Sequence, residues 1–310
     1  MTVVVAGGTG LAGSAIVRAF EKSGADVIGV NRSVVNLLDR EATIAYVKKI
    51  KPSIIVDAAA KVGGIGANNT FPVEFLVDNT RIQSNLMEAA HAAEVERFVF
   101  LGSSCIYPRD CAQPIKEEYL LTGPLEQTNS AYAVAKIAGI ELIKSYRKEY
   151  NHRWISLMPT NLYGPRDNFD LQHAHVLPAL IRRFVEAKNT GAEKVVLWGT
   201  GSPKREFLHV DDLARAVVMA SSKYDGNEHI NIGTGEDLTI KELAELISRL
   251  AGFQGVIEWD SSKPDGTPRK VLDVTKAKSL GWSPEISLED GIASTIEWYV
   301  SATAKGEARL

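Results

Sequence analysis

The feature that most constrains the fold is a glycine-rich turn between a short strand and a helix at the start of the chain. Residues 2–6 form a β-branched run, and residues 7–13 follow with glycine at positions 7, 8, 10 and 13. Apolar residues at helical spacing then run over 14–23. Strand, glycine turn and helix in this order predict a dinucleotide site, in which backbone amides and a helix N-terminus face pyrophosphate. A tight turn without a ligand is the alternative interpretation.

Further along the chain, apolar strands alternate with helical patterns, which is typical of a parallel, doubly wound α/β sheet. The ligand crevice of such a sheet lies at the carboxyl ends of its strands. Strands are predicted at 26–30, 53–58, 97–101, 154–158 and 194–198, and helices at 79–93, 131–150 and 178–188.

The strict alternation loosens after residue 165. We therefore expect a Rossmann dinucleotide-binding domain over residues 1–165, with segments at about 206–233 returning to it. The remaining residues, 166–205 and 234–310, are expected to form a smaller C-terminal α/β substrate domain. Residues 302–310 have the composition of a disordered tail.

Composition narrows the classes of partner. The chain has 310 residues, 45% of them hydrophobic and 24% charged, with a net charge of −3. This balance gives no general attraction to nucleic acid or to an anionic membrane, and no apolar run approaches the ~20 residues of a membrane span. The first strand follows Met1 directly, without a signal peptide, and two cysteines cannot form a disulfide framework. A cytoplasmic enzyme with small-molecule partners, free Cys105 and Cys111 thiols and no metal site is expected.

The end of the second predicted strand bears on coenzyme preference. Asn31 and Arg32 stand where an NAD-preferring site would place an acid to hold the ribose 2′-hydroxyl. The planar fork of an arginine suits a 2′-phosphate instead. The sequence therefore favours NADP(H), with a solvated loop arginine as the alternative.

Tyr132 and Lys136 are four residues apart on a predicted helix, so that a phenol and an ammonium share one face. A nearby cation favours phenolate, so we expect Lys136 to make Tyr132 a proton donor or acceptor near neutral pH. This pair alone is also compatible with an ordinary solvated helix face.

Taken together, the glycine loop, Ser103, Tyr132 and Lys136 resemble the extended short-chain dehydrogenase/reductases that act on nucleotide sugars. Within that class the sequence resembles the GDP-L-fucose synthase family over nearly its whole length. The segments that carry this closer resemblance are 58–65, 67–70, 102–108, 158–165 and 263–270.

The resemblance implies 3,5-epimerisation and NADPH-dependent 4-reduction of GDP-4-keto-6-deoxy-D-mannose. Tyr132 would protonate the developing alkoxide, Ser103 would hydrogen-bond the carbonyl oxygen, and Lys136 would bind the nicotinamide ribose. Epimerisation next to the ketone needs two acid/base groups, for which Cys105 and His175 are the candidates. A buried small hydrophobe and a capping histidine are the ordinary alternatives for these two residues.

The resemblance also implies which residues bind the substrate and which bind the coenzyme. The substrate-binding candidates are Arg183, Trp198, Arg205 and Asp265, with a core tryptophan, exposed arginines and a turn aspartate as the alternatives. The helices at 79–93 and 131–150 are candidate homodimer faces. The expected coenzyme contacts are Gly7, Gly8, Thr9, Gly10, Leu11, Ala12, Gly13, Arg32, Asn36, Leu37, Leu101, Gly102, Ser103, Ser104, Tyr132, Lys136, Pro159, Thr160, Asn161, Leu162 and His175.

Three rival interpretations remain at this stage. The chain could be another nucleotide-sugar enzyme, such as a 4-epimerase or a 4,6-dehydratase, although a dehydratase usually has an acidic pair where this chain has Ser104 and Cys105. It could act on a related GDP-4-keto sugar that lacks the 3-hydroxyl and needs epimerisation at C5 only. It could also be an NADPH-sensing module without turnover, although such sensors commonly lose the tyrosine or the lysine.

Overall fold

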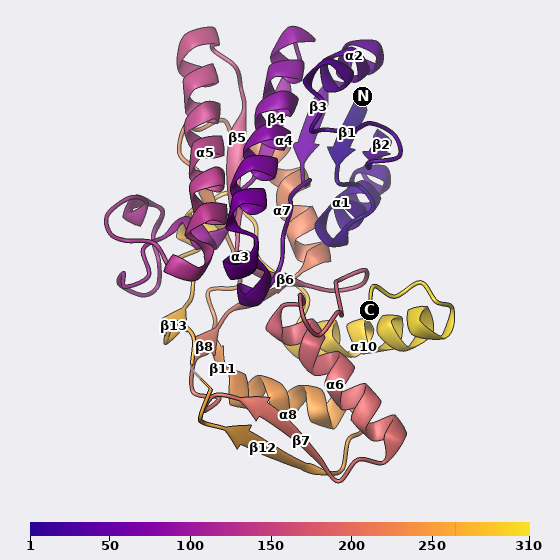
Figure 1. Ribbon diagram of the computed structural model, residues 1–310. Helices are drawn as coiled ribbons and strands as arrows, with labels where there is room; N and C mark the ends of the chain where they lie inside the picture. The colour runs from indigo at the N-terminus through magenta and orange to yellow at the C-terminus, as the bar shows by residue number, and fades with distance from the viewer. Residues whose placement is uncertain (264) are drawn as a thin grey trace.

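The computed structural model describes residues 1–263 and 265–310, so Pro264 of the 263–270 segment lies outside the described residues. Its centre is a six-stranded parallel sheet with the strand order β10-β5-β4-β3-β1-β2 (Figure 1). The doubly wound parallel sheet predicted from the sequence is thus confirmed. Its strands are β1 (Thr2–Ala6), β2 (Asp26–Val30), β3 (Ile54–Asp57), β4 (Arg97–Leu101), β5 (Ile155–Pro159) and β10 (Ile230–Ile232).

The central strands are buried on both faces, which is why they are continuous apolar runs. Alternate residues enter two different cores: Ile55 and Phe100 join one cluster, and Val56 and Val99 join the other. The first core lies under α2 (Arg40–Ile50), α4 (Pro72–Ala92) and α5 (Ser130–Tyr150). The second lies under α1 (Leu11–Lys22), α7 (Val210–Lys223) and the short α9 (Thr275–Ser279).

A smaller lobe lies below the carboxyl ends of these strands in Figure 1. Its core packs three helices against a parallel two-stranded sheet. The helices are α6 (Val176–Thr190), α8 (Ile240–Ala251) and α10 (Leu288–Ala304), and the strands are β7 (Lys194–Trp198) and β12 (Val256–Asp260).

Short elements join the two lobes. A three-stranded sheet has the order β11-β8-β13, and a pair of strands joins β6 to β9. These elements are β6 (Asn161–Tyr163), β8 (Lys204–Arg205), β9 (Phe207–His209), β11 (Leu238–Thr239) and β13 (Arg269–Lys270), together with α3 (Ile65–Thr70) and three 3-10 turns, η1 (Ser104–Ile106), η2 (Glu117–Tyr119) and η3 (Gln127–Asn129).

Two stretches behave differently from the sequence-based expectation. The last residues were expected to be a disordered tail, but this prediction was wrong, because α10 extends to Ala304 and the amide of Phe169 donates to the carbonyl of Arg309 at 2.8 Å. In addition, Leu272 and Val274 enter one core of the main sheet, and Ala277 and Trp282 enter the other. The chain therefore returns to the large lobe twice after residue 205.

Glu206 joins these returning segments. Its side chain is fully buried, and its carboxylate accepts hydrogen bonds from the amides of Gly235 at 2.7 Å and Leu272 at 2.9 Å. Burial raises the pKa of Glu206, and these hydrogen bonds oppose the rise. One carboxylate thus holds the loop after β10 and the returning segment at Leu272 beside β9.

We expect Glu206→Ala to lower the free energy of unfolding by about 3 kcal/mol or more, because it leaves buried amides without acceptors. Urea unfolding followed by circular dichroism measures this change. Glu245→Ala, at an exposed position of α8, is the matched control and should change stability by less than about 0.5 kcal/mol. Equal stability of the two variants would contradict this role for Glu206.

Candidate active site

The glycine loop is closed by sterics that only glycine satisfies. Gly7 has φ +75°, and a Cβ at Gly13 would lie 2.1 Å from the carbonyl oxygen of Gly7. The amide of Gly10 donates to that same oxygen at 2.9 Å. Gly10 caps α1 without a side-chain hydrogen bond, so the first amides of the helix point out of the loop toward the crevice end of the sheet. This cradle fits a dinucleotide pyrophosphate.

The segment after β2 carries the residues proposed to select the coenzyme. Arg32 is exposed and forms no ion pair within the part of the chain that the structure describes. The side chain of Asn31 accepts from the Ser33 amide at 2.9 Å, which fixes the turn. Leu37 is buried, while Asn36 remains exposed. An available guanidinium at this strand end fits a ribose 2′-phosphate.

Ser103, Tyr132 and Lys136 come together at the carboxyl end of β4. The Lys136 ammonium is buried, donates to the carbonyl of Leu101 at 2.9 Å, and lies 5.9 Å from the centre of the Tyr132 ring. Burial raises the pKa of Tyr132, Cys105 adds to the rise, and a hydrogen bond with Ser103 opposes it. The phenol therefore keeps its proton at neutral pH.

This electrostatic result differs from the expectation that Lys136 would favour the phenolate. The lysine ammonium is directed to the end of β4, whereas the phenol is desolvated. Burial also lowers the pKa of Lys136 itself. Without a ligand, the arrangement suits Tyr132 as a proton donor, and the lysine does not offset its desolvation.

Cys105 lies on η1, two residues after Ser103, whose hydroxyl accepts from the Cys105 amide at 3.2 Å. The Cys105 sulfur is 3.4 Å from Nδ2 of Asn129 and 3.8 Å from Nζ of Lys270. An amide donor and an ammonium therefore both lie beside this thiol. Sequence reasoning missed both neighbours: Asn129 stands three residues before Tyr132, but Lys270 lies 165 residues from the cysteine.

His175 is the residue before α6 and makes no side-chain capping hydrogen bond there. The residue is open to solvent on one side, yet surrounding protein atoms lower the pKa of its imidazole by desolvation. The preceding backbone packs on the loop after β3, where the Gly64 amide donates to His173 at 2.9 Å. Phe75, which borders that loop at Gly63, meets the Tyr132 ring edge-on at 6.2 Å between centres. Short contacts thus connect the His175 segment to Tyr132.

The other expected coenzyme contacts lie at neighbouring strand ends. The Gly102 amide donates to Leu157 at 2.9 Å, so the loop of Ser103 and Ser104 leaves β4 beside β5. Pro159 ends β5, and Thr160 donates its amide to Ile232 at 3.0 Å. The following residues, Asn161 and Leu162, lie in β6. All of these residues border the crevice edge of the sheet.

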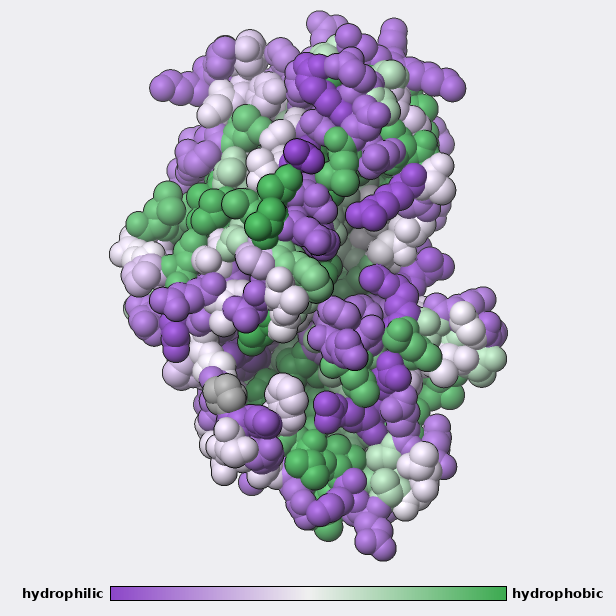
Figure 2. Space-filling model, in the orientation of Figure 1, coloured by the Kyte–Doolittle hydropathy of each residue, from purple (hydrophilic) through white to green (hydrophobic). Residues whose placement is uncertain are grey.

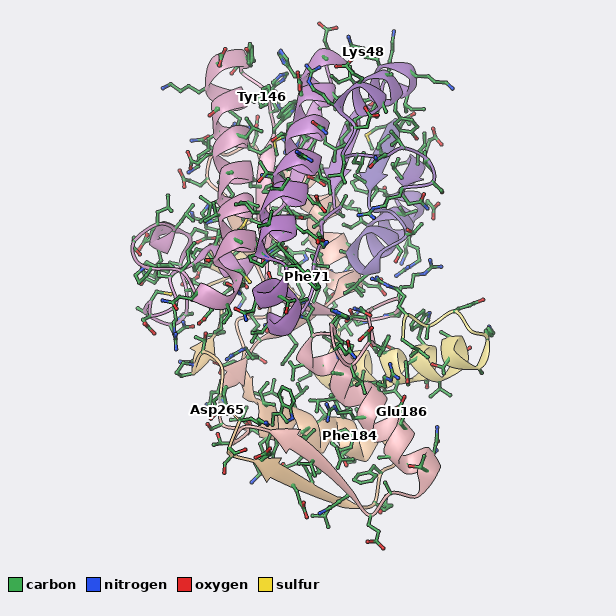
Figure 3. All side chains as sticks on the ribbon, viewed as in Figure 1. Lys48, Phe71, Tyr146, Phe184, Glu186 and Asp265 are labelled. Carbon is green, nitrogen blue, oxygen red and sulfur yellow. The ribbon has the colours of Figure 1, made fainter. Side chains whose placement is uncertain are left out.

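The four substrate-binding candidates surround the end of β7 in the small lobe. Arg183 donates to the carbonyl of Val196 at 3.3 Å, and Trp198 is 70% exposed with the Lys263 ammonium 5.7 Å from its ring centre. The carboxylate of Asp265, labelled in the lower lobe of Figure 3, accepts from the amide and hydroxyl of Thr200 at 2.9 and 2.7 Å. These hydrogen bonds lower the pKa of Asp265.

Arg205 completes this group from β8. Its guanidinium donates to the carbonyl of Thr267, and burial lowers its pKa. The exposed Trp198 ring is open to stack on a ligand, whereas Asp265 already has a turn-forming role with Thr200.

A single segment, residues 265–270, connects the two halves of the site. Asp265 bonds the turn after β7, Thr267 accepts from Arg205, and Lys270 reaches the sulfur of Cys105. The pairing of β13 with β8 in parallel register fixes this path. The residues near Trp198 and those near Cys105 are therefore positioned by one short segment of chain that ends in β13.

Metal-ligand clusters, membrane-spanning helices and the state of the cysteines remain to be described. Residues 1–263 and 265–310 contain no cluster of three or more His, Cys, Asp or Glu side chains suited to hold a metal ion. In the same residues, no helix combines the length and apolar character that crossing a membrane requires. Cys105 and Cys111 are both free thiols.

The fold and this site are those of a known family. The family model described as "NAD dependent epimerase/dehydratase family" matches residues 3–233, and the chain belongs to this family. It is 52% identical to GDP-L-fucose synthase 1 of Arabidopsis thaliana over 96% of this chain and 93% of that one. It is 50% identical to GDP-L-fucose synthase of Escherichia coli over 96% of both chains.

A solved structure agrees with these relatives. A GDP-L-fucose synthetase from Naegleria fowleri bound to NADP is 28% identical and superimposes with a TM-score of 0.90, covering 100% of this chain and 96% of that chain. The resemblance to GDP-L-fucose synthases predicted from sequence motifs is therefore confirmed.

The contact between Lys270 and Cys105 can be tested directly. In a Cys111→Ser background, Lys270→Met should slow alkylation of Cys105 by iodoacetamide at pH 7 several-fold, because the thiolate loses its nearest ammonium. Mass spectrometry of the labelled peptide measures the rate. Lys263→Met, which removes an exposed ammonium beside Trp198, is the matched control, and an equal effect of both substitutions would contradict the assignment.

Proposed function

We propose that this protein is a bifunctional 3,5-epimerase and 4-reductase that converts GDP-4-keto-6-deoxy-D-mannose to GDP-L-fucose with NADPH. The observation that carries the proposal is the Cys105 sulfur, held by Asn129 and Lys270 on the loop that also bears Ser103. A simple reductase needs no second acid/base group at this position. The relatives named GDP-L-fucose synthase support the same reaction.

NADP(H) would be held by the crevice edge of the large domain, residues 1–165 with the returning segments. The glycine loop and the first amides of α1 would bind the pyrophosphate, and Arg32 would bind the 2′-phosphate. The contacts of Leu101 to Ser104 and of Pro159 to Leu162 would line the nicotinamide end. When bound, NADPH supplies the hydride that reduces the C4 ketone.

In the reduction, Tyr132 gives its proton to the oxygen of the C4 ketone as negative charge develops there. Ser103 donates a hydrogen bond to the same oxygen, which stabilises that charge. The buried ammonium of Lys136 stabilises the phenolate that remains. The raised pKa of Tyr132 supports this direction of proton transfer, because the group begins the step protonated.

In the epimerisations, one group removes the proton from C3 or C5 and another returns a proton to the opposite face. We assign these roles to Cys105 and His175, with Ser103 and Tyr132 stabilising the enolate oxygen. Asn129 and Lys270 hold the Cys105 sulfur in this position, at 3.4 and 3.8 Å. The lowered pKa of His175 supports a neutral imidazole near pH 7, which is able to accept the proton from one face, so that the Cys105 thiol is the group that returns a proton to the other.

The GDP portion would lie across the small lobe. Arg183 and Arg205 would neutralise the diphosphate, Trp198 would stack on a ring, and Asp265 would accept from hydroxyl groups. The burial of Arg205 supports its role, because a partly desolvated guanidinium binds anions strongly.

Two variants separate the two halves of the reaction. With NADPH and GDP-4-keto-6-deoxymannose, Tyr132→Phe should lower coenzyme oxidation by roughly 10²–10⁴-fold. Cys105→Ser should slow solvent deuterium uptake into the sugar while the affinity for NADPH is retained. Absorbance at 340 nm and mass spectrometry measure the two steps. Normal turnover by Tyr132→Phe, or wild-type deuterium uptake by Cys105→Ser, would refute the corresponding role.

We further propose that the protein is a cytoplasmic homodimer formed through α4 and α5. Figure 2 shows hydrophobic residues gathered over the region of α3, α4 and α5. Phe71 is 43% exposed, Val73 72%, Leu76 36% and Val134 46%. A second copy of this chain, with the same apolar face, would bury these residues in a two-fold interface.

Light scattering should give twice the chain mass of 33.7 kDa for the wild-type protein. The double variant Val73→Glu and Val134→Glu should be monomeric, because the interface would bury unpaired charges. Val300→Glu, an exposed position on α10, should remain dimeric. A monomeric wild-type protein would refute this proposal.

A further inference from the structure

A row of three side chains crosses the central sheet beneath Lys136. The parallel register places Asp57 of β3 beside Phe100 of β4, and Phe100 beside Ser156 of β5. Residues in register on neighbouring strands point to the same face, and Phe100 belongs to the core under α4 and α5. Asp57 is 1% exposed and Ser156 is 3% exposed. A carboxylate thus lies inside the sheet face against which α5 packs.

Lys136 reaches the same place from α5. Its ammonium lies 4.8 Å from the centre of the Phe100 ring and donates to the carbonyl of the next residue, Leu101. An ammonium has three donors, and this hydrogen bond uses one of them. The Phe100 ring is therefore flanked by the lysine ammonium and, one strand away, by Asp57.

The two oxygens of the Asp57 carboxylate differ in their hydrogen bonding. One oxygen accepts from the Ala59 amide at 3.2 Å, and the other has no hydrogen-bond partner among residues 1–263 and 265–310. Buried charges are retained in proteins when an opposite charge compensates them. The Lys136 ammonium is the opposite charge that acts on Asp57.

The titration of the two groups supports this view. Burial raises the pKa of Asp57 to about 6, and Lys136 opposes the rise. Burial lowers the pKa of Lys136, and Asp57 opposes that change. Each group therefore favours the charged form of the other.

We propose that Asp57 is a positioning residue that acts through Lys136, keeping the lysine side chain charged and directed at the end of β4. The sequence analysis did not single out this residue, because an aspartate at the end of a strand has many ordinary roles. The kinetic test of this inference rests on the proposed reduction, whereas the stability test does not.

Other groups also surround the pair. Tyr132, on the same helix as Lys136, is influenced by Asp57 and by Cys105 from η1, and both raise its pKa. From α4, the neutral side chain of Gln83 donates to the carbonyl of Ala135, beside Lys136. Asp57 is the charged group that acts on Lys136 itself.

The first test uses stability and needs no substrate. Because the pKa of Asp57 is raised in the folded protein, its contribution to stability is present below the unfolded value of 3.8 and is lost as pH rises through about 6. Asp57→Asn should therefore raise Tm relative to the parent protein between pH 5 and pH 8, by on the order of 3 °C.

The same substitution is then made in a Lys136→Met background. There the carboxylate lacks its compensating ammonium, so the pH-dependent gain in Tm should be clearly larger. Ser156→Ala is the matched control, because it removes a buried, uncharged side-chain hydroxyl that has no partner within the described residues, on the other flank of Phe100. Its effect should not depend on pH. An equal pH-dependent gain with and without Lys136 would overturn the proposal.

The second test is the pH profile of kcat/KM for reduction by the full-length enzyme. Asp57→Asn should move the alkaline limb to lower pH by about one unit, because Lys136 then loses its proton more easily. Loss of the Asp57 charge also lowers the pKa of Tyr132, which moves the limb in the same direction. A uniformly lower profile with an unchanged limb would indicate a structural role only.

The two tests fail in distinguishable ways. A wild-type protein that does not oxidise NADPH with the ketosugar would contradict the proposed function. The Tm values of Asp57→Asn with and without Lys136→Met would still decide whether Asp57 and Lys136 interact. Additive Tm changes in an active enzyme would contradict the proposal about Asp57 alone.

Discussion

One hydrogen bond, from the Lys136 ammonium to the carbonyl of Leu101, fixes the position of α5 against the end of β4. Because Tyr132 is one helical turn earlier on α5, the bond also fixes the distance between the phenol and the strand end. Ser103 and Cys105 follow Leu101 on the same loop, so these two candidate residues and Tyr132 are positioned relative to this contact. The cost is a buried cation, which the Phe100 ring and the Asp57 carboxylate surround.

Local patterns in the sequence were sufficient to predict most of the large lobe. The expected strands 2–6, 26–30 and 97–101 match β1, β2 and β4. Of these, β1 and β4 are buried strands, which form nearly continuous apolar runs. The glycine loop was predictable because steric closure at Gly7 and Gly13 leaves no alternative residue. The class of chemistry followed from Tyr132, Lys136 and the segments shared with relatives.

What the sequence did not reveal depends on contacts between distant segments. Lys270 meets Cys105 only because β13 pairs with β8, and two-residue strands leave no periodic signal. The return of residues 272–282 to the main sheet is held by the buried Glu206 carboxylate and by backbone hydrogen bonds to Ile115. The sequence also does not show that burial raises the pKa of the Tyr132 phenol, because burial of that kind is visible only in three dimensions.

The segment 265–270 constrains how such a site changes during evolution. The same few residues fix the turn beside Trp198, receive the guanidinium of Arg205 and carry the ammonium next to the Cys105 sulfur. A shift in this segment that accommodates a different nucleotide would also move the charge beside the thiol. The positions of the substrate-binding candidates and the surroundings of the Cys105 sulfur are thus mechanically linked, so selection on either one constrains the other.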